Sequence, residues 1–119
     1  MYLHKEINSI EALPQKAGKG VSMKMLLSPQ ESPNFAMRNF IIEAGGHMPL
    51  HTNAIEHEQY VIAGRALVQI GDKKVEAKTG DIFLIPAGVA HSYETIGEES
   101  YSFLCLVPNT QDCITLISN

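Results

Sequence analysis

Residues 45–64 read GGHMPLHTNAIEHEQYVIAG, and residues 80–95 read GDIFLIPAGVAHSYET. These two stretches hold three histidines, His51, His57 and His91, at three separate places in a chain of 119 residues. Three imidazole nitrogens make a ligand set that suits a divalent transition metal. The two stretches therefore predict a metal site, provided that the fold brings the three rings together.

Short apolar and β-branched runs between turn residues predict an all-β fold. The predicted strands are residues 22–27, 36–42, 59–62, 66–70, 74–77, 81–85, 92–96 and 101–107. Turns are predicted at Gly45-Gly46, at Gly64, at Gly71-Asp72, at Gly80 and at Gly88. Many short strands with regular turns are typical of a sandwich or a barrel.

Two terminal segments fall outside this pattern. Residues 8–16 are expected to form a helical turn at most. Residues 113–117 are expected to form a last strand, a short helix or a tail exchanged between two protomers. No repeat or linker divides the chain, so residues 1–119 are expected to form one domain.

Strand alternation predicts which side chains share the interior. Side chains two residues apart lie on the same face of a strand, so His51 and Asn53 are expected to point the same way. After a short loop, His57 opens the next strand, and Gln59 shares its face. Asn53 is predicted to act either as a weak fourth ligand through its carbonyl oxygen or as a group that orients a bound water or substrate.

Four further residues are candidates for the pocket lining: His47, Gln59, Tyr93 and Arg38. His47 stands four residues before His51 and is either a surface residue or part of the pocket mouth. Arg38 is either a structural residue or the partner of a substrate carboxylate, which a guanidinium binds in bidentate fashion. His4 is expected to be a surface residue.

The charge balance of this ligand set indicates the kind of ligand. Three neutral imidazoles and a neutral amide leave the full charge on a divalent ion, and an unbalanced buried charge is costly. The site should therefore favour a small anionic molecule, such as a carboxylate or an enolate. Glu56 and Glu58 carry negative charge nearby, but alternation points both away from the interior if His57 points inward.

The glycine, proline and histidine spacing of the two stretches resembles the paired motifs of the cupin superfamily. That resemblance implies a double-stranded β-helix, or jelly-roll, barrel with a metal pocket. The first motif departs from the usual pattern, because Asn53 stands where a histidine is usual and His57 stands where a glutamate is usual. The run Ile55-Glu56-His57-Glu58 is similar to small cupins of an HxHxxEHE subgroup, some of which hold manganese and carry a provisional oxalate decarboxylase label.

Composition excludes several classes of function. The net charge of −4 and the lack of a Lys/Arg cluster argue against a nucleic-acid surface. The first fifteen residues lack an apolar core and a cleavage site, and no apolar run approaches a membrane helix in length. Cytoplasm is therefore the expected compartment, with Cys105 and Cys113 as reduced core residues.

A homodimer is also expected, with residues 21–27 and 113–117 at its interface, because a small barrel leaves sheet edges that a second copy can cover. The resemblance implies the same association.

Two classes of function fit these residues. The first is a metal-dependent enzyme, of the oxygenase, decarboxylase or isomerase type, that acts on a small carboxylate or enolisable substrate. Its cofactor would be one divalent transition metal: Mn, Fe, Ni, Cu or Zn. The second is a non-catalytic cupin that binds or senses a small molecule, with a weakened or absent metal site.

Overall fold

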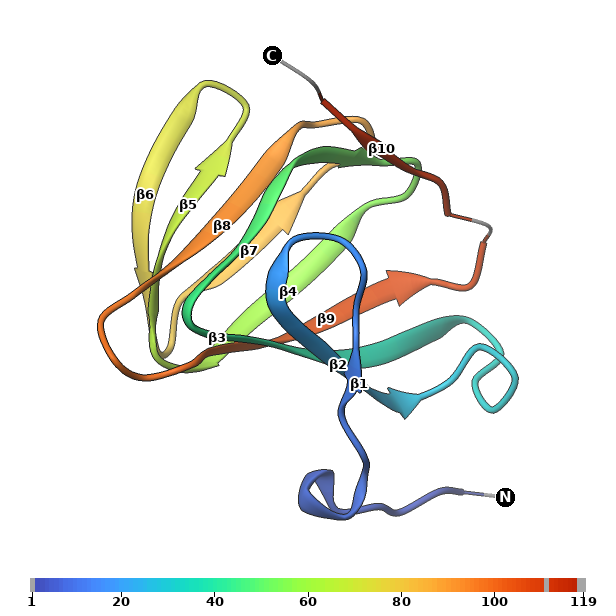
Figure 1. The fold of residues 1–119 in the computed structure, drawn as a ribbon. Coiled ribbons are helices and arrows are strands. Elements are labelled where there is room, and N and C mark those ends of the chain that lie inside the picture. Colours follow the sequence, from blue (N-terminus) through green and yellow to red (C-terminus); the bar gives the residue numbers. More distant parts are fainter. Residues whose placement is uncertain (1, 111, 118–119) are drawn as a thin grey trace.

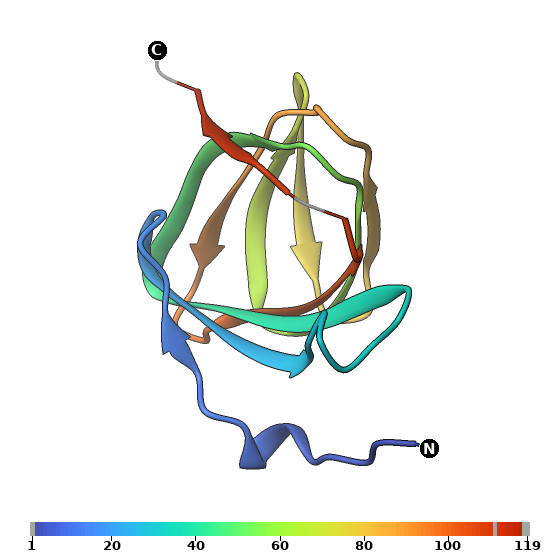
Figure 2. The ribbon, with the colours of Figure 1, turned by 90° about the vertical axis from the view of Figure 1, so that its right-hand side faces the viewer.

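The protein folds as an antiparallel β-structure that curls into a barrel (Figures 1 and 2). This computed structural model describes residues 2–110 and 112–117. Its elements are the 3-10 helix η1 (Ile7–Ser9) and the strands β1 (Leu13–Pro14), β2 (Lys19–Leu27), β3 (Phe35–Asn53), β4 (His57–Ala63), β5 (Arg65–Ile70), β6 (Lys73–Lys78), β7 (Ile82–Ile85), β8 (His91–Ile96), β9 (Tyr101–Pro108) and β10 (Ile114–Leu116).

The main strand order is β6-β5-β8-β3-β9-β4-β7, with β2 and β10 also paired to β3. Every pairing is antiparallel. The predicted all-β jelly-roll barrel is therefore confirmed, and each predicted strand appears with ends shifted by a few residues at most, except β3.

Strand β3 is the element that sequence analysis divided wrongly. A turn was predicted at Gly45-Gly46, but the strand runs through both glycines as far as Asn53. Its first half pairs with β2 and β9, and its second half pairs with β8 and β10. Gly45 has φ of 79°, a backbone conformation that glycine adopts without strain, so the glycines bend the strand instead of ending it.

The core lies between the two curved halves of the sheet. Its largest fully buried side chains include two aromatic rings of β9, Tyr101 and Phe103, whose centroids are 5.5 Å apart. Phe103 also stacks on Tyr93 of β8, with a centroid distance of 5.1 Å. These three aromatic rings belong to one cluster of buried core residues.

The terminal segments have partners inside the chain. Residues 21–27, expected at a dimer interface, belong to β2 and pair along β3. Residues 114–116 form the last strand, one of the predicted alternatives, and cross the end of the barrel on β3 (Figure 2). These segments are therefore not unused edges. In the described part of the chain no helix is long and apolar enough to cross a membrane.

The two cysteines are free, as predicted. Cys105 lies in the core, as expected, whereas Cys113 is exposed. The prediction that both are core residues is wrong for Cys113, because it begins the segment that crosses the outside of the barrel end.

Candidate functional site

Three histidines from three strands meet at the open end of the barrel. His51 lies near the end of β3, His57 opens β4, and His91 opens β8, directly opposite His51 in the strand register. The ring centroids of His51 and His91 are 4.2 Å apart, and those of His57 and His91 are 6.2 Å apart. All three side chains are buried. The fold therefore brings the three rings together.

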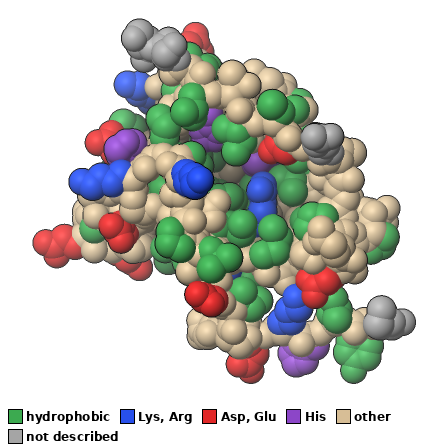
Figure 3. Space-filling view, turned by 45° about the vertical axis from the view of Figure 1, so that its right-hand side comes forward, with side chains coloured by type: hydrophobic (Ala, Val, Ile, Leu, Met, Phe, Trp, Pro, Cys, Tyr) green, Lys and Arg blue, Asp and Glu red, His purple; other side chains and the backbone are tan. Residues whose placement is uncertain are grey.

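The rings line a cavity of about 430 Å³. Other predicted residues share it, namely Asn53, Gln59, Tyr93 and Arg38. Figure 3 shows histidine side chains at the back of a hollow, with a basic side chain beside them and hydrophobic side chains around the rim. The cavity therefore combines buried imidazoles, two basic side chains (Arg38 and Lys16) and an apolar wall.

His47 is the one predicted pocket residue that the fold places elsewhere. It is exposed and lines a separate groove with Leu67 and Glu94. The register between β3 and β8 shifts between Met48 and His51, so the two-residue alternation is interrupted there. His47 consequently faces outward although it has the same parity as His51.

Backbone carbonyls orient two of the imidazoles. His51 Nδ1 lies 2.7 Å from the carbonyl oxygen of Pro49, and His91 Nδ1 lies 3.0 Å from that of Val89. Since a carbonyl oxygen only accepts, each Nδ1 carries the proton and donates it. In the neutral form of each ring Nε2 then carries no proton, which is the form that binds a metal.

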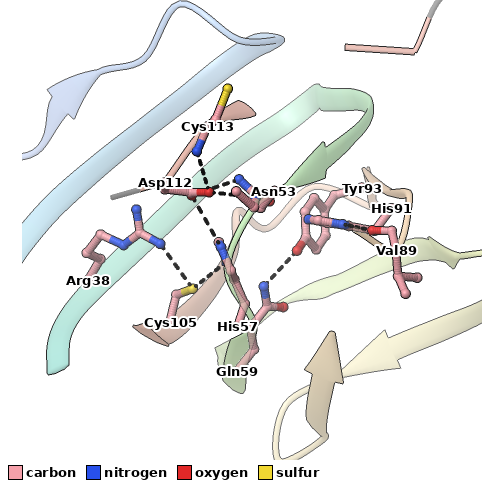
Figure 4. A network of polar contacts seen from close by, with 11 residues as sticks. Arg38, Asn53, His57, Gln59, Val89, His91, Tyr93, Cys105, Asp112 and Cys113 are labelled. Carbon is pink, nitrogen blue, oxygen red and sulfur yellow. Dashed lines mark hydrogen bonds and ion pairs between the residues drawn. The ribbon is translucent and has the colours of Figure 1, made fainter. Parts of the chain in front are cut away.

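His57 has different neighbours (Figure 4). Its Nδ1 lies 3.2 Å from Sγ of Cys105, and its Nε2 lies 3.7 Å from Oδ2 of Asp112. A thiol is both a weak donor and a weak acceptor, so Cys105 fits either tautomer of this ring. Cys105 keeps its proton, because burial raises the pKa of the thiol.

Two of these imidazoles stay neutral at pH 7. Burial lowers the pKa of His57 to about 4, and the nearby charge of Arg38 adds to that shift. Burial also lowers the pKa of His91 to about 4. Both rings therefore keep an electron pair free for a metal or a proton over the whole neutral range.

The donor set fits a divalent transition metal. It contains three imidazoles, and the amide oxygen of Asn53 and Nε2 of His57 are buried without a hydrogen-bond partner among the described residues. Buried polar atoms normally have a hydrogen-bond partner, an ordered water or an ion, so these two atoms are free to bind one. The rings are not closed around a point, however: within residues 2–110 and 112–117, no three His, Cys, Asp or Glu side chains are arranged to enclose an ion.

Sequence analysis missed one residue of the site, Asp112. Its carboxylate accepts hydrogen bonds from Nδ2 of Asn53 at 3.0 Å and from the backbone N–H of Ala54 at 2.9 Å. Glu56 and Glu58 are exposed, as alternation predicted. Neither motif indicates Asp112, because this residue lies more than fifty positions after Asn53 and Ala54 in the sequence. The one available signal was its position as an acidic residue just before the predicted terminal strand.

Comparison with known proteins agrees with this fold. The Cupin domain family profile matches residues 38–107, which is more than half of the chain. This chain belongs to the cupin domain family. The resemblance drawn from the two motifs is therefore confirmed at the level of the superfamily.

Relatives of this cupin include an uncharacterized protein of Methanocaldococcus jannaschii, 33% identical over 66 residues, which cover 55% of this chain and 53% of that protein. The match thus spans about half the length of that relative. Solved structures with the same fold include the polyketide cyclase RemF from Streptomyces resistomycificus, with a TM-score of 0.91, 22% identity, and coverage of 100% of this chain and 87% of that one.

A predicted oxalate decarboxylase from Thermotoga maritima has a TM-score of 0.78 and 23% identity, over 89% of this chain and 98% of that one. At these identities the similarity establishes the fold. The structural neighbours of this cupin include enzymes.

The depressed histidine pKa values predict how stability depends on pH. The unfolded chain binds protons at these rings near pH 6.5, whereas the folded metal-free protein binds them near pH 4. The free energy of unfolding should therefore fall as pH drops from about 6.5 to 4, by up to about 1.4 kcal/mol per pH unit for each ring. Urea unfolding with a chelator present, between pH 7.5 and 4.5, measures this slope. His91→Gln should reduce it, and an unchanged slope would contradict the assignment.

Proposed function

We propose that this cupin binds one divalent transition metal through His51, His57 and His91, with Asn53 beside the ion. The observation that carries the proposal is the convergence of three buried imidazoles on one cavity, two of them with Nδ1 tied to a backbone carbonyl. Pre-oriented imidazoles lose little freedom when they bind a metal. Mn, Fe, Ni, Cu and Zn all accept such ligands.

The proposed substrate is a small carboxylate or enolisable anion. Arg38 lies half-buried on the cavity wall, 5.1 Å above the ring of Phe40, and its Nη2 lies 3.6 Å from Sγ of Cys105. Its Nε is buried and has no hydrogen-bond partner in the part of the chain that the structure describes. A guanidinium with unused donors in a cavity suits a carboxylate of matching size.

Other residues would hold and screen that anion. Nε2 of Gln59 donates to the hydroxyl oxygen of Tyr93 at 2.7 Å, so the hydroxyl keeps its own proton free to donate into the cavity. Burial raises the pKa of Tyr93, so this proton stays in place at neutral pH. Phe103, Met48 and Ile114 supply apolar walls that keep water away from the reacting end of the substrate.

A bound metal would supply Lewis-acid chemistry or, for iron or copper, oxygen activation. Around it, Arg38 would fix the anion and Tyr93 would donate a hydrogen bond to an oxygen of that anion. These roles suit an oxygenase, a decarboxylase or an isomerase. The enzymes among the structural neighbours support the proposal at the level of the fold.

A second candidate is a non-catalytic cupin that captures the same class of anion without a metal. The observation that favours it is that the three imidazoles are not closed around a point among the described residues. Arg38 and Tyr93 alone would then bind the ligand. In either case we propose a cytoplasmic location, because the two cysteines are free.

The metal site is tested by elemental analysis of protein purified without added metal and after loading with Mn, Fe, Ni, Cu or Zn in turn. His91→Ala should remove most of the bound metal, because it deletes one of three imidazole ligands. His47→Ala should leave the stoichiometry unchanged, because His47 faces the separate groove. If no metal binds to the wild-type protein under any loading, the metal-dependent enzyme is excluded and the binding cupin is preferred.

The role of Arg38 is tested by calorimetric titration with oxalate as the probe. Arg38→Met keeps most of the side-chain volume and removes the cation, so oxalate affinity should fall at least tenfold, because a charged hydrogen-bonded pair is lost. Arg65→Met is the matched control, because Arg65 lies on the exposed surface of β5. An equal affinity of wild type and Arg38→Met would show that this guanidinium does not bind the anion.

We also propose a homodimer. Its interface would include the outer face of β4 and β7, and would not consist of residues 21–27 and 113–117 alone. Tyr60 and Ile82 are paired neighbours on these strands and are 45% and 76% exposed, and Leu84 beside them is 57% exposed. β7 also ends the strand order, so its outer edge has no partner within the described sheet. An apolar face on an open edge suits a second copy arranged with two-fold symmetry.

Light scattering at micromolar concentration should give the mass of two chains. Leu84→Glu should shift the mass to one chain, because it places a charge in the proposed interface. Val75→Glu, on the exposed strand β6 at the other end of the strand order, should leave the dimer intact. A monomeric wild-type protein would rule out the dimer.

A further inference from the structure

The carboxylate of Asp112 lies beside Asn53 and His57, two residues that line the histidine cavity. Asp112 comes just before β10, which pairs across the barrel end with Ile114 opposite Asn53 and Leu116 opposite His51. Its Oδ1 accepts from the backbone N–H groups of Ala54 and Cys113, at 2.9 and 2.7 Å. These contacts hold one oxygen in place and leave Oδ2 facing Asn53 and His57 (Figure 4).

Oδ2 of Asp112 lies between two groups of the proposed metal site. It accepts from Nδ2 of Asn53 at 3.0 Å, and it lies 3.7 Å from Nε2 of His57. The second distance is too long for a good hydrogen bond, and Nε2 has no other partner among the described residues. The 3.7 Å distance between Oδ2 and Nε2 is close to the roughly 3 to 3.5 Å that separates two ligand atoms when each lies about 2.1 Å from a shared ion.

The electrostatics of the cavity also call for an anion at this point. Three neutral imidazoles and an amide would leave a divalent ion with its full charge in a buried site, beside the cation of Arg38. One carboxylate halves the charge of the ion and lowers the cost of burying it. Asp112 is the one acidic side chain that the described structure joins to Asn53 and His57.

We propose that Asp112 is the carboxylate ligand of the metal, brought to the three histidines by the C-terminal strand β10. This proposal rests on the proposed metal site. The metal ligands would then come from both motifs and from the segment just before β10. A bound ion would therefore hold β10 against the barrel. It also makes Asn53 a neighbour of the ion that orients Asp112 through Nδ2.

The test is calorimetric titration of the metal-free full-length protein with Zn²⁺. Asp112→Asn should weaken zinc binding by at least tenfold, as is typical when a metal site loses a supporting group. The amide oxygen of the variant can still accept from the backbone N–H groups of Ala54 and Cys113, so β10 should stay in place. Glu56→Gln is the matched control: it removes the same charge from an exposed position beside His57, and its zinc affinity should equal that of wild type.

The outcomes separate the two proposals. If wild type binds zinc and Asp112→Asn binds it equally well, Asp112 is not a ligand, and the three-histidine site stands without it. If wild type does not bind zinc or any other loaded metal, the proposed function itself fails, and this inference fails with it.

A purely structural role for Asp112 is tested with Thr115→Pro, which disrupts the pairing of β10 and keeps the carboxylate. Hydrogen exchange of residues 114–116 reports the loosening of the strand in both variants. If Asp112→Asn loosens β10 and loses no more affinity than Thr115→Pro, Asp112 acts only by holding the strand, and the proposal is overturned. A loss in Asp112→Asn while β10 stays protected supports it.

Discussion

The site depends on one strand, β3, that belongs to both halves of the barrel. Its first half pairs with β2 and β9 and carries Arg38, and its second half pairs with β8 and β10 and carries His51. A single bent strand therefore joins the cationic wall of the cavity to the imidazoles. A break at Gly45-Gly46 would have separated them. The backbone freedom of glycine at this bend is thus a condition for the site.

Burial gives the cavity its chemistry. It keeps two imidazoles neutral, the Cys105 thiol protonated and the Tyr93 hydroxyl protonated. Charged groups near the rings include the Arg38 guanidinium and the Asp112 carboxylate, whose opposite effects on the pKa of His57 partly cancel, and Lys16 also lines the cavity. A cavity with neutral donors in the middle and charges of both signs around them suits a cation bound together with a small anion.

The sequence was sufficient to predict an all-β fold and most strands, because period-two alternation and turn residues are local signals. The jelly-roll barrel and the convergence of His51, His57 and His91 were expected from the resemblance of the two motifs to those of cupins. The sequence left His47 open between a surface position and the pocket mouth, and the structure shows the surface position. The strand register shifts just before His51, and alternation carries no sign of such a shift. Sequence analysis missed Asp112 for a different reason. That carboxylate meets its partners through the pairing of β10 with β3, a long-range contact that no local pattern encodes.

The central claim is that three buried imidazoles form one metal site. The most direct measurement is a crystal structure of the zinc-loaded protein with diffraction data collected on both sides of the zinc absorption edge. We expect one anomalous peak per chain, within about 2.1 Å of ring nitrogens of His51, His57 and His91. A peak at an exposed histidine such as His47, or no peak in the cavity at full zinc loading, would contradict it.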